Sequence, residues 1–173
     1  MSFKIETKRL VLRPPVLNDA TALARWINDP AVANQTGGIP HPYSALHAEF
    51  WILTRPSAWR RRLEHTTVVE RHGAVIGTAS LFRASRDDHF SLGYMLARDH
   101  WGQGLMSEAV GGLLDVADRE WGAGAIDASV FVDNPASIAI LERHGFERTG
   151  ELSLYSAGRC GHAPGLRYRR PAP

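Results

Sequence analysis

A glycine-containing segment between a strand-like run and a helical run constrains this chain most. Residues 90–97 read as a strand, and the apolar residues after Ser107 then recur at helical spacing until Gly122. The stripe comprises Val110, Leu113, Leu114, Ala117 and Trp121. Residues 125–132 alternate again, with Ile126, Ala128, Val130 and Val132 on one side. A strand, a helix and a second strand in this order predict a crossover between two parallel strands.

The remaining runs extend this crossover into one α+β unit that spans residues 1–173. Further strands are expected at residues 9–13, 66–70, 74–81, from Phe146 onwards and around 166–169. Helices are expected from Asn18 or Asp19 to Ile27, from about Ser44 to Leu53, and from Asn134-Pro135 to Gly145. Residues 31–43, which hold four Gly or Pro residues, read as an irregular loop.

Composition excludes several classes of protein. A length of 173 residues suits one domain, and 44% hydrophobic residues suit a globular chain. The single cysteine, Cys160, has no partner for an internal disulfide. The charged first ten residues and the lack of a long apolar run exclude a signal peptide and a membrane span, so we expect a cytoplasmic protein. With a net charge of +2 and no broad basic stripe, we expect no nucleic-acid partner.

The segment Trp101-Gly102-Gln103-Gly104 lies where the helix begins. Unpaired N–H groups and the dipole at a helix N-terminus suit a phosphate, and glycines let such an anion approach the main chain. The alternative is a tight turn without a ligand. A second strand-to-helix junction at Asp133-Asn134-Pro135 favours a binding crevice, because two such junctions would face one opening.

These motifs together resemble the Gcn5-related N-acetyltransferase (GNAT) superfamily, and within it the RimJ/RimL-type branch that acetylates the N-termini of ribosomal proteins. The resemblance covers nearly the whole chain. The matching segments are Glu6 to Pro14 with Asp19-Ala20, Leu92-Gly93-Tyr94-Met95-Leu96, Trp101 to Ala109, and Asn134 to Ser137 continuing through Leu141 to Phe146. The resemblance implies a mixed, mostly antiparallel sheet of six to seven strands with a splayed parallel pair, flanked by about four helices.

The resemblance also implies acetyl-CoA as co-substrate and no metal. Its pyrophosphate would lie on Trp101, Gly102, Gln103, Gly104, Leu105, Met106 and Ser107, and its pantetheine along Met95, Leu96 and Ala97. Asn134 is expected either to cap its helix or to contact the cofactor. Ser137 is the candidate catalytic residue, because relatives in this branch carry a serine here that donates a proton to the CoA sulfur.

Three positions depart from the family pattern. Met106 places a long side chain where a tiny one is usual, so its direction decides whether CoA affinity is lost. Leu141 occupies the position of a frequent general-acid tyrosine, and Ser91 replaces a common carboxylate. The general base therefore stays open among Glu108, Asp87, Asp88, His89, His41, His47, Glu64 and a water chain, with Glu108 more typical of a residue that stabilises the helix dipole.

The predicted reaction is direct acetyl transfer from CoA to an amine. Without an obvious carboxylate base, a protein or peptide α-amine is favoured over a lysine, because a larger fraction of it is neutral near pH 7. Residues 28–43 and 51–62 are expected to wall the acceptor site. The alternatives are acetylation of a small-molecule amine, a non-catalytic acyl-CoA-binding module, and a nucleotide-binding α/β domain. The last is disfavoured because this chain has no Lys-Ser/Thr after the glycines. A homodimer is one arrangement left open.

Overall fold

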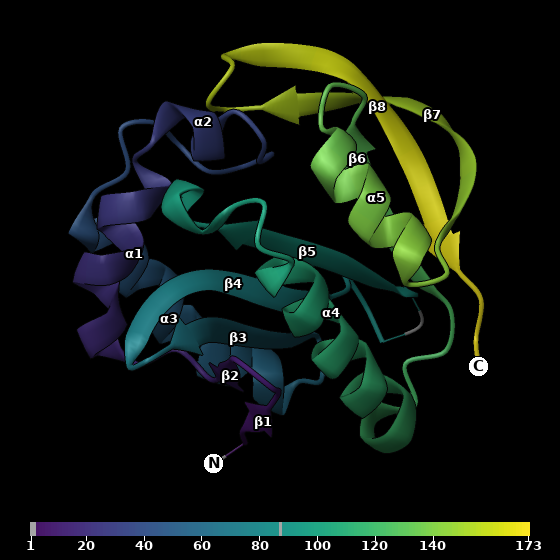
Figure 1. Ribbon diagram of the computed structural model, residues 1–173, viewed down its shortest axis with the longest axis horizontal. Helices are drawn as coiled ribbons and strands as arrows, with labels where there is room; N and C mark the ends of the chain where they lie inside the picture. Colours follow the sequence, from purple (N-terminus) through teal and green to yellow (C-terminus); the bar gives the residue numbers. More distant parts are fainter. Residues whose placement is uncertain (1–2, 87) are drawn as a thin grey trace.

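The computed structural model describes residues 3–86 and 88–173, and its frame is one eight-stranded sheet in the order β1-β2-β3-β4-β5-β6-β8-β7 (Figure 1). The strands are β1 (Ile5–Glu6), β2 (Val11–Arg13), β3 (Glu64–Arg71), β4 (Ala74–Phe82), β5 (Phe90–Leu96), β6 (Ile126–Phe131), β7 (Glu147–Ser156) and β8 (Gly161–Arg170). The expectation of six to seven strands is one short. The missed strand is β1, whose two residues are too few to show alternation and which pairs with β2 through Ile5 and Leu12.

Neighbouring strands are antiparallel except β5 and β6, which are parallel. The predicted crossover between them is therefore confirmed. It passes through α4 (Leu105–Val116) and the π-helical turn Ala117–Trp121. Of the predicted stripe, the four residues from Val110 to Ala117 are buried, and Trp121 is partly buried. Val132 was wrongly placed on the apolar side of the strand, because β6 ends at Phe131 and Val132 is 50% exposed.

The other helices are α1 (Ala20–Ile27), α2 (Pro30–Ala33), α3 (Ala45–Arg60) and α5 (Pro135–Arg143). The expected irregular loop thus contains α2, which begins because the Asp29 carboxylate accepts a hydrogen bond from the Ala31 N–H (2.8 Å) with Pro30 at the first helical position. The helix α3 continues beyond the expected Leu53 and through Pro56. Its last turn is held by Trp59, whose ring packs edge-on against His65 at 4.7 Å. Within the described ranges, no helix is long and apolar enough to cross a bilayer.

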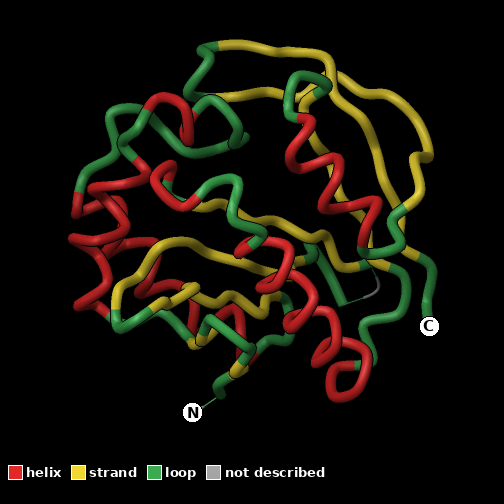
Figure 2. The backbone as a smooth tube through the Cα atoms, in the orientation of Figure 1, coloured by secondary structure: helices red, strands yellow, loops and turns green. Residues whose placement is uncertain are grey.

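Helices cover both faces of the sheet (Figure 2). The face that carries Val69 packs on α4, while the face that carries Val68 packs on α1 and α3. Because side chains alternate along a strand, these two adjacent valines belong to two separate cores. In Figure 1, α4 and α5 lie in front of the sheet and α3 lies behind it. The strand β5 therefore has helices packed on both of its faces.

Candidate active site

Two glycines in the left-handed backbone region shape the loop before α4. Gly102 has a φ of 72°, and Gly104, the N-cap residue, has a φ of 68°. A Cβ at either position would meet no heavy atom closer than 3.8 Å, so glycine is required for backbone conformation and not for packing. The Glu108 N–H donates to the Gly104 carbonyl (3.1 Å), which leaves the N–H groups of residues 105–107 without partners inside the helix. This open helix end fits a pyrophosphate.

Met106 points away from this helix end. Its side chain is 5% exposed, and its terminal methyl lies 3.3 Å from where a Cβ on Gly77 of β4 would stand. Leu105 is also in the core. The long side chain that departs from the family pattern therefore packs against the sheet. The main-chain N–H of Met106 stays available to a ligand at the N-terminus of α4.

The carboxylate of Glu108 is fully engaged within the first turn of α4. It accepts hydrogen bonds from the Thr7 hydroxyl (2.7 Å), the Arg9 N–H (2.7 Å) and the Arg9 guanidinium (2.6 Å). Burial opposes its ionisation, but these hydrogen bonds and the Arg9 charge outweigh burial and hold the pKa of Glu108 below its usual range. The geometry makes Glu108 an anchor between the N-terminal segment and α4, and a poor proton acceptor.

The free edge of β5 forms the second part of the site. Parallel pairing joins Phe90–Leu92 to residues 126–128, and β5 then continues to Leu96 without β6 beside it. The Ala97 N–H donates to the Ile76 carbonyl on the β4 side (2.8 Å). Because the main-chain groups of successive residues point to opposite sides of a strand, those of Tyr94 and Leu96 face away from β4. They face the space between β5 and β6 beyond the last paired residues, which we call the opening. The predicted splay is thus present, with Leu96 on its edge and the main-chain N–H of Ala97 turned away.

Trp101 closes the end of this edge. Its indole N–H donates to the Leu96 carbonyl at 2.7 Å, so that carbonyl is already paired. The Trp101 ring remains 43% exposed at the mouth of the opening. Gln103 points elsewhere, because its side chain accepts from Arg71 (2.9 Å) and donates to the Asp99 carbonyl (3.3 Å).

The N-terminus of α5 faces the splayed edge. Asn134 caps the helix, because its Oδ1 accepts a hydrogen bond from the Ser137 N–H at 3.0 Å. Across the opening, the Tyr94 hydroxyl donates to the Ser137 carbonyl at 3.1 Å. Ser137 is therefore held from both sides, by its own helix and by β5.

Two cavities meet at this point. The first, of about 470 Å³, is lined by ten of the twelve predicted site residues: Met95, Leu96, Trp101, Gly102, Gly104, Leu105, Met106, Ser107, Asn134 and Ser137. Ala97 and Gln103 are not among its lining residues. The second, of about 810 Å³, is bounded by residues 35–39 and by Trp51, Arg55 and Ala58 of α3. Both cavities include Gln35, Thr36, Tyr94, Met95, Asn134 and Ser137. We name the first the α4 cavity, because the start of α4 lines it, and the second the α3 cavity.

The departures at Leu141 and Ser91 are visible in the α3 cavity. Leu141 lies in the core with 2% exposure and offers no proton. Ser91 is paired with Asp127 of β6, and both line the cavity, but the Asp127 carboxylate is bound by Arg169 (2.6 Å). Hydrogen bonds from Arg169 hold the pKa of Asp127 low, which makes it a weak base.

The other candidate bases are mostly committed to structural contacts. Glu64 lines the α3 cavity and is bound by Arg55 and Thr66. His47 accepts from the Ser44 N–H at the start of α3, and Asp88 accepts from the Ser85 N–H. His41 and His89 line neither cavity, and Asp87 lies outside the described residues. Across residues 3–86 and 88–173, no group of three or more His, Cys, Asp or Glu side chains is placed to hold a metal ion.

Sequence reasoning did not single out Tyr94, Gln35, Thr36 or Asp133 as individual residues of the opening. The signal for Tyr94 was present, because it lies one position before Met95 on the strand that was expected to bind the pantetheine. Gln35 and Thr36 lie within residues 28–43, which were expected to wall the acceptor site, and Asp133 lies in the junction that was expected to face the crevice. No local pattern distinguishes these three residues from their neighbours in those segments.

Comparison with known proteins agrees with this geometry. Residues 9–147 match the sequence model described as "Acetyltransferase (GNAT) domain". An uncharacterized N-acetyltransferase p20 from Bacillus licheniformis is 30% identical over 151 residues, covering 86% of this chain and 85% of that protein. The solved ribosomal-protein-S5-alanine acetyltransferase from Vibrio fischeri has a TM-score of 0.86 and 21% identity, covering 98% and 97% of the two chains. RimJ of Mycobacterium smegmatis, in complex with CoA-disulfide, has a TM-score of 0.85 and 20% identity, covering 99% and 87%.

Proposed function

Because the chain belongs to the GNAT family of acetyltransferases, which use acetyl-CoA, we propose that it transfers the acetyl group to the α-amine of a peptide or protein N-terminus. The observation that carries this proposal is the meeting of two cavities at Tyr94, Asn134 and Ser137. One cavity has the features that a pyrophosphate and an extended pantetheine require. The other offers separate room for an acceptor.

Acetyl-CoA would occupy the α4 cavity. The positive φ of Gly102 and Gly104 and the open N–H groups of residues 105–107 supply donors for its pyrophosphate. The main-chain N–H and carbonyl of Tyr94 and the N–H of Leu96 face the same cavity. These groups suit an extended amide chain that adds to the edge of the sheet. These features support the assignment of Leu96, Gly102, Gly104, Leu105, Met106 and Ser107 to the cofactor site. Met95, Trp101 and Asn134 are assigned to it because they line the α4 cavity.

The charges around the α3 cavity favour an α-amine over a polyamine. Both carboxylates that line it, Glu64 and Asp127, are already ion-paired, with Arg55 and Arg169. A polycation would find no unpaired carboxylate among the described lining residues. The Arg55–Glu64 pair is mostly buried, so removing Arg55 from Glu64 is costly. An extended peptide end with one amine is the acceptor that this lining suits better.

Proton chemistry points to the same acceptor. A protein α-amine has a pKa of about 7.7–8.0, so roughly a tenth of it is neutral at pH 7, whereas less than about a thousandth of a lysine amine is neutral. Among the described residues that line the α3 cavity, no carboxylate or histidine is free to act as a base, so an amine that deprotonates readily reacts faster. The neutral amine attacks the thioester carbon, and the resulting tetrahedral intermediate loses its surplus N–H proton to water and expels the thiolate. Ser137 donates a proton to the sulfur and takes one back from water.

The test is a competition with acetyl-CoA between a lysine-free peptide with a free N-terminus and an N-blocked peptide that contains lysine. CoA release is followed by chromatography, because the exposed Cys160 thiol would react with a thiol reagent. Mass spectrometry locates the acetyl group, which we expect on the α-amine. Preferential acetylation of the lysine overturns the α-amine assignment. Turnover of polyamines or aminoglycosides with neither peptide touched establishes a small-molecule acceptor instead.

A further inference from the structure

Arg159, in the turn between β7 and β8, joins three segments that are far apart in the sequence. Its guanidinium makes a bidentate pair with the Asp133 carboxylate (2.8 and 2.9 Å). It also donates to the Asn34 carbonyl (2.6 Å) and to the Gln35 side chain (3.4 Å). The Cζ atom of the guanidinium lies 4.3 Å from the centre of the Phe131 ring, which shields one face of the ion pair. Figure 1 shows this turn beside α2.

The turn itself packs against the segment that follows α2. A Cβ on Gly158 would lie 2.8 Å from the carbonyl carbon and oxygen of Ala33, so the two backbones touch here. The Ala157 N–H donates to the Gly37 carbonyl at 2.8 Å. The segment 33–37 is therefore fixed from outside, by a turn that lies about 120 residues further along the chain.

The contacts of Arg159 lie directly behind the opening. Asp133 precedes Asn134, which caps α5 and binds the Ser137 N–H. Asp133 and Gln35 both line the α4 cavity, and Gln35 also lines the α3 cavity. Arg159 itself lines neither of these two cavities, so any effect it has on the reaction passes through the residues that it contacts. Of these, Asp133 and Gln35 line the α4 cavity, and Gln35 and Phe131 line the α3 cavity.

The Asp133–Arg159 pair is well formed for a surface contact. The Arg159 side chain is 21% exposed, because the Phe131 ring and the Asn34 and Gln35 contacts cover it, while Asp133 is more open. Hydrogen bonds from Arg159 hold the pKa of Asp133 below its usual range. Planar bidentate geometry fixes direction as well as distance, which a single lysine contact would not do.

We propose that Arg159 is a positioning residue that holds the two walls of the opening, the segment 34–37 and the junction 133–137, at a fixed separation. Reacting atoms must be held within tenths of an ångström to react efficiently, so a wall released by loss of this clamp slows transfer. The kinetic part of this inference rests on the proposed acetyl transfer to an α-amine. Its structural part concerns the chain alone.

The experiment uses Arg159→Met, Asp133→Asn and the double variant, with Arg170→Met as the matched control. Arg170 also lies at an end of β8 and makes a bidentate pair, with Asp118 (2.9 and 2.6 Å), but it lines neither cavity. We expect Arg159→Met to lower kcat/KM for the accepted peptide on the order of 10- to 100-fold, with the Arg170 control within about 2-fold of wild type. The double variant should lose no more kcat/KM than Arg159→Met alone, because both substitutions remove the same Arg159–Asp133 contact.

Amide hydrogen exchange without substrates supplies a readout that does not depend on activity. Residues 34–37 and 133–137 should exchange faster in Arg159→Met than in wild type, and at the wild-type rate in Arg170→Met. Unchanged exchange in these segments, or equal losses of kcat/KM in the Arg159 and Arg170 variants, overturns the proposal. If wild type acetylates no peptide, the proposed acceptor fails, and the exchange rates still decide whether the clamp exists.

Discussion

The hydroxyl of Tyr94 on β5 donates a hydrogen bond to the main-chain carbonyl of Ser137 on α5, over 3.1 Å. This contact crosses the opening where β5 and β6 no longer pair. Burial raises the pKa of Tyr94 to about 12, so the phenol stays protonated and remains a donor at neutral pH. A side-chain bond thus links the splayed strand to the helix that carries the candidate proton donor.

Tyr94→Phe removes this bond and retains the ring. We expect the free energy of unfolding to fall by about 1 kcal/mol, because the Ser137 carbonyl loses a partly buried donor. We also expect kcat to fall on the order of 10-fold, because Ser137 is no longer held toward β5. Tyr168→Phe is the matched control, since the Tyr168 hydroxyl bonds Glu142 at the same distance of 3.1 Å near the other end of α5. Equal kcat values in the two variants would show that the Tyr94 contact is structural only.

Ser137→Ala tests the proposed proton donor. We expect kcat to fall by about 10²-fold, a typical share for one general acid, while the dissociation constant of acetyl-CoA changes little. The main-chain contacts of Ser137 with Asn134 and Tyr94 survive the change, so the helix start is preserved. Ser137→Thr, which keeps a hydroxyl, should recover part of the rate. If the alanine variant turns over at the wild-type rate, water or another side chain protonates the sulfur.

Local features of the fold could be predicted from the sequence because they depend on neighbouring residues. The helix start at Gly104 depends on a positive φ, and the cap at Asn134 depends on a side chain three residues from its donor. The short helix α2 was missed because Asp29-Pro30 ends one helix and begins the next, and the first role hid the second. In the parallel crossover, periodicity alone was sufficient.

Contacts between distant residues could not be predicted. Glu108 and Arg9 are 99 residues apart, and Arg159 and Asn34 are 125 apart. In the sequence, each of these four residues is only a charged or polar side chain in a loop or first helical turn. Such a residue is as typical of a solvated surface as of a tertiary contact. The direction of the Met106 side chain also required the position of Gly77, which makes room for it on β4.

Gly104→Val tests the loop before α4. Valine is strongly disfavoured at a φ of 68°, so we expect the helix start to distort and acetyl-CoA binding to weaken by roughly 1–3 kcal/mol in calorimetry. Gly104→Asn separates two causes, because asparagine tolerates this backbone region and mainly adds bulk. Gly124→Val is the control: Gly124 has a φ of 63° and lines neither cavity. It should lower stability and leave affinity unchanged. Unchanged affinity in a folded Gly104→Val protein would remove this loop from the cofactor site.

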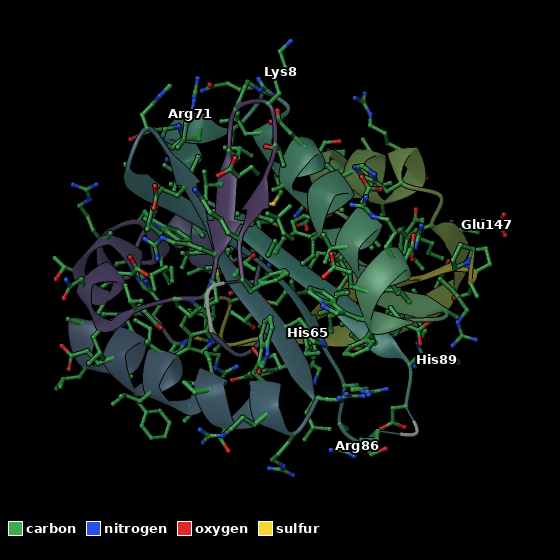
Figure 3. The ribbon with its side chains drawn as sticks, turned by 90° about the horizontal axis from the view of Figure 1, so that it is seen from below. Lys8, His65, Arg71, Arg86, His89 and Glu147 are labelled. Carbon is green, nitrogen blue, oxygen red and sulfur yellow. The ribbon has the colours of Figure 1, made fainter. Side chains whose placement is uncertain are left out.

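His65 makes the stability of the fold depend on pH. His65, labelled in Figure 3, is 8% exposed. Its ring stacks on that of Trp121, with centroids 3.9 Å apart and planes 7° apart. Its buried Nδ1 has no hydrogen-bond partner in the part of the chain that the structure describes. Burial, followed by the charges of Arg83 and Arg62, lowers the pKa of His65 to about 4 from its ordinary 6.5.

The sign of the effect follows from these two pKa values. Above pH 6.5 the histidine is neutral in both states and its contribution to stability is complete. Between pH 6.5 and 4 the unfolded chain binds a proton that the folded chain does not, so the free energy of unfolding falls by up to about 1.4 kcal/mol per pH unit. His65→Phe keeps an aromatic ring against Trp121 and removes the proton. Urea unfolding at several pH values should therefore show a shallower slope for His65→Phe than for wild type across this window, and identical slopes would place the titrating group elsewhere.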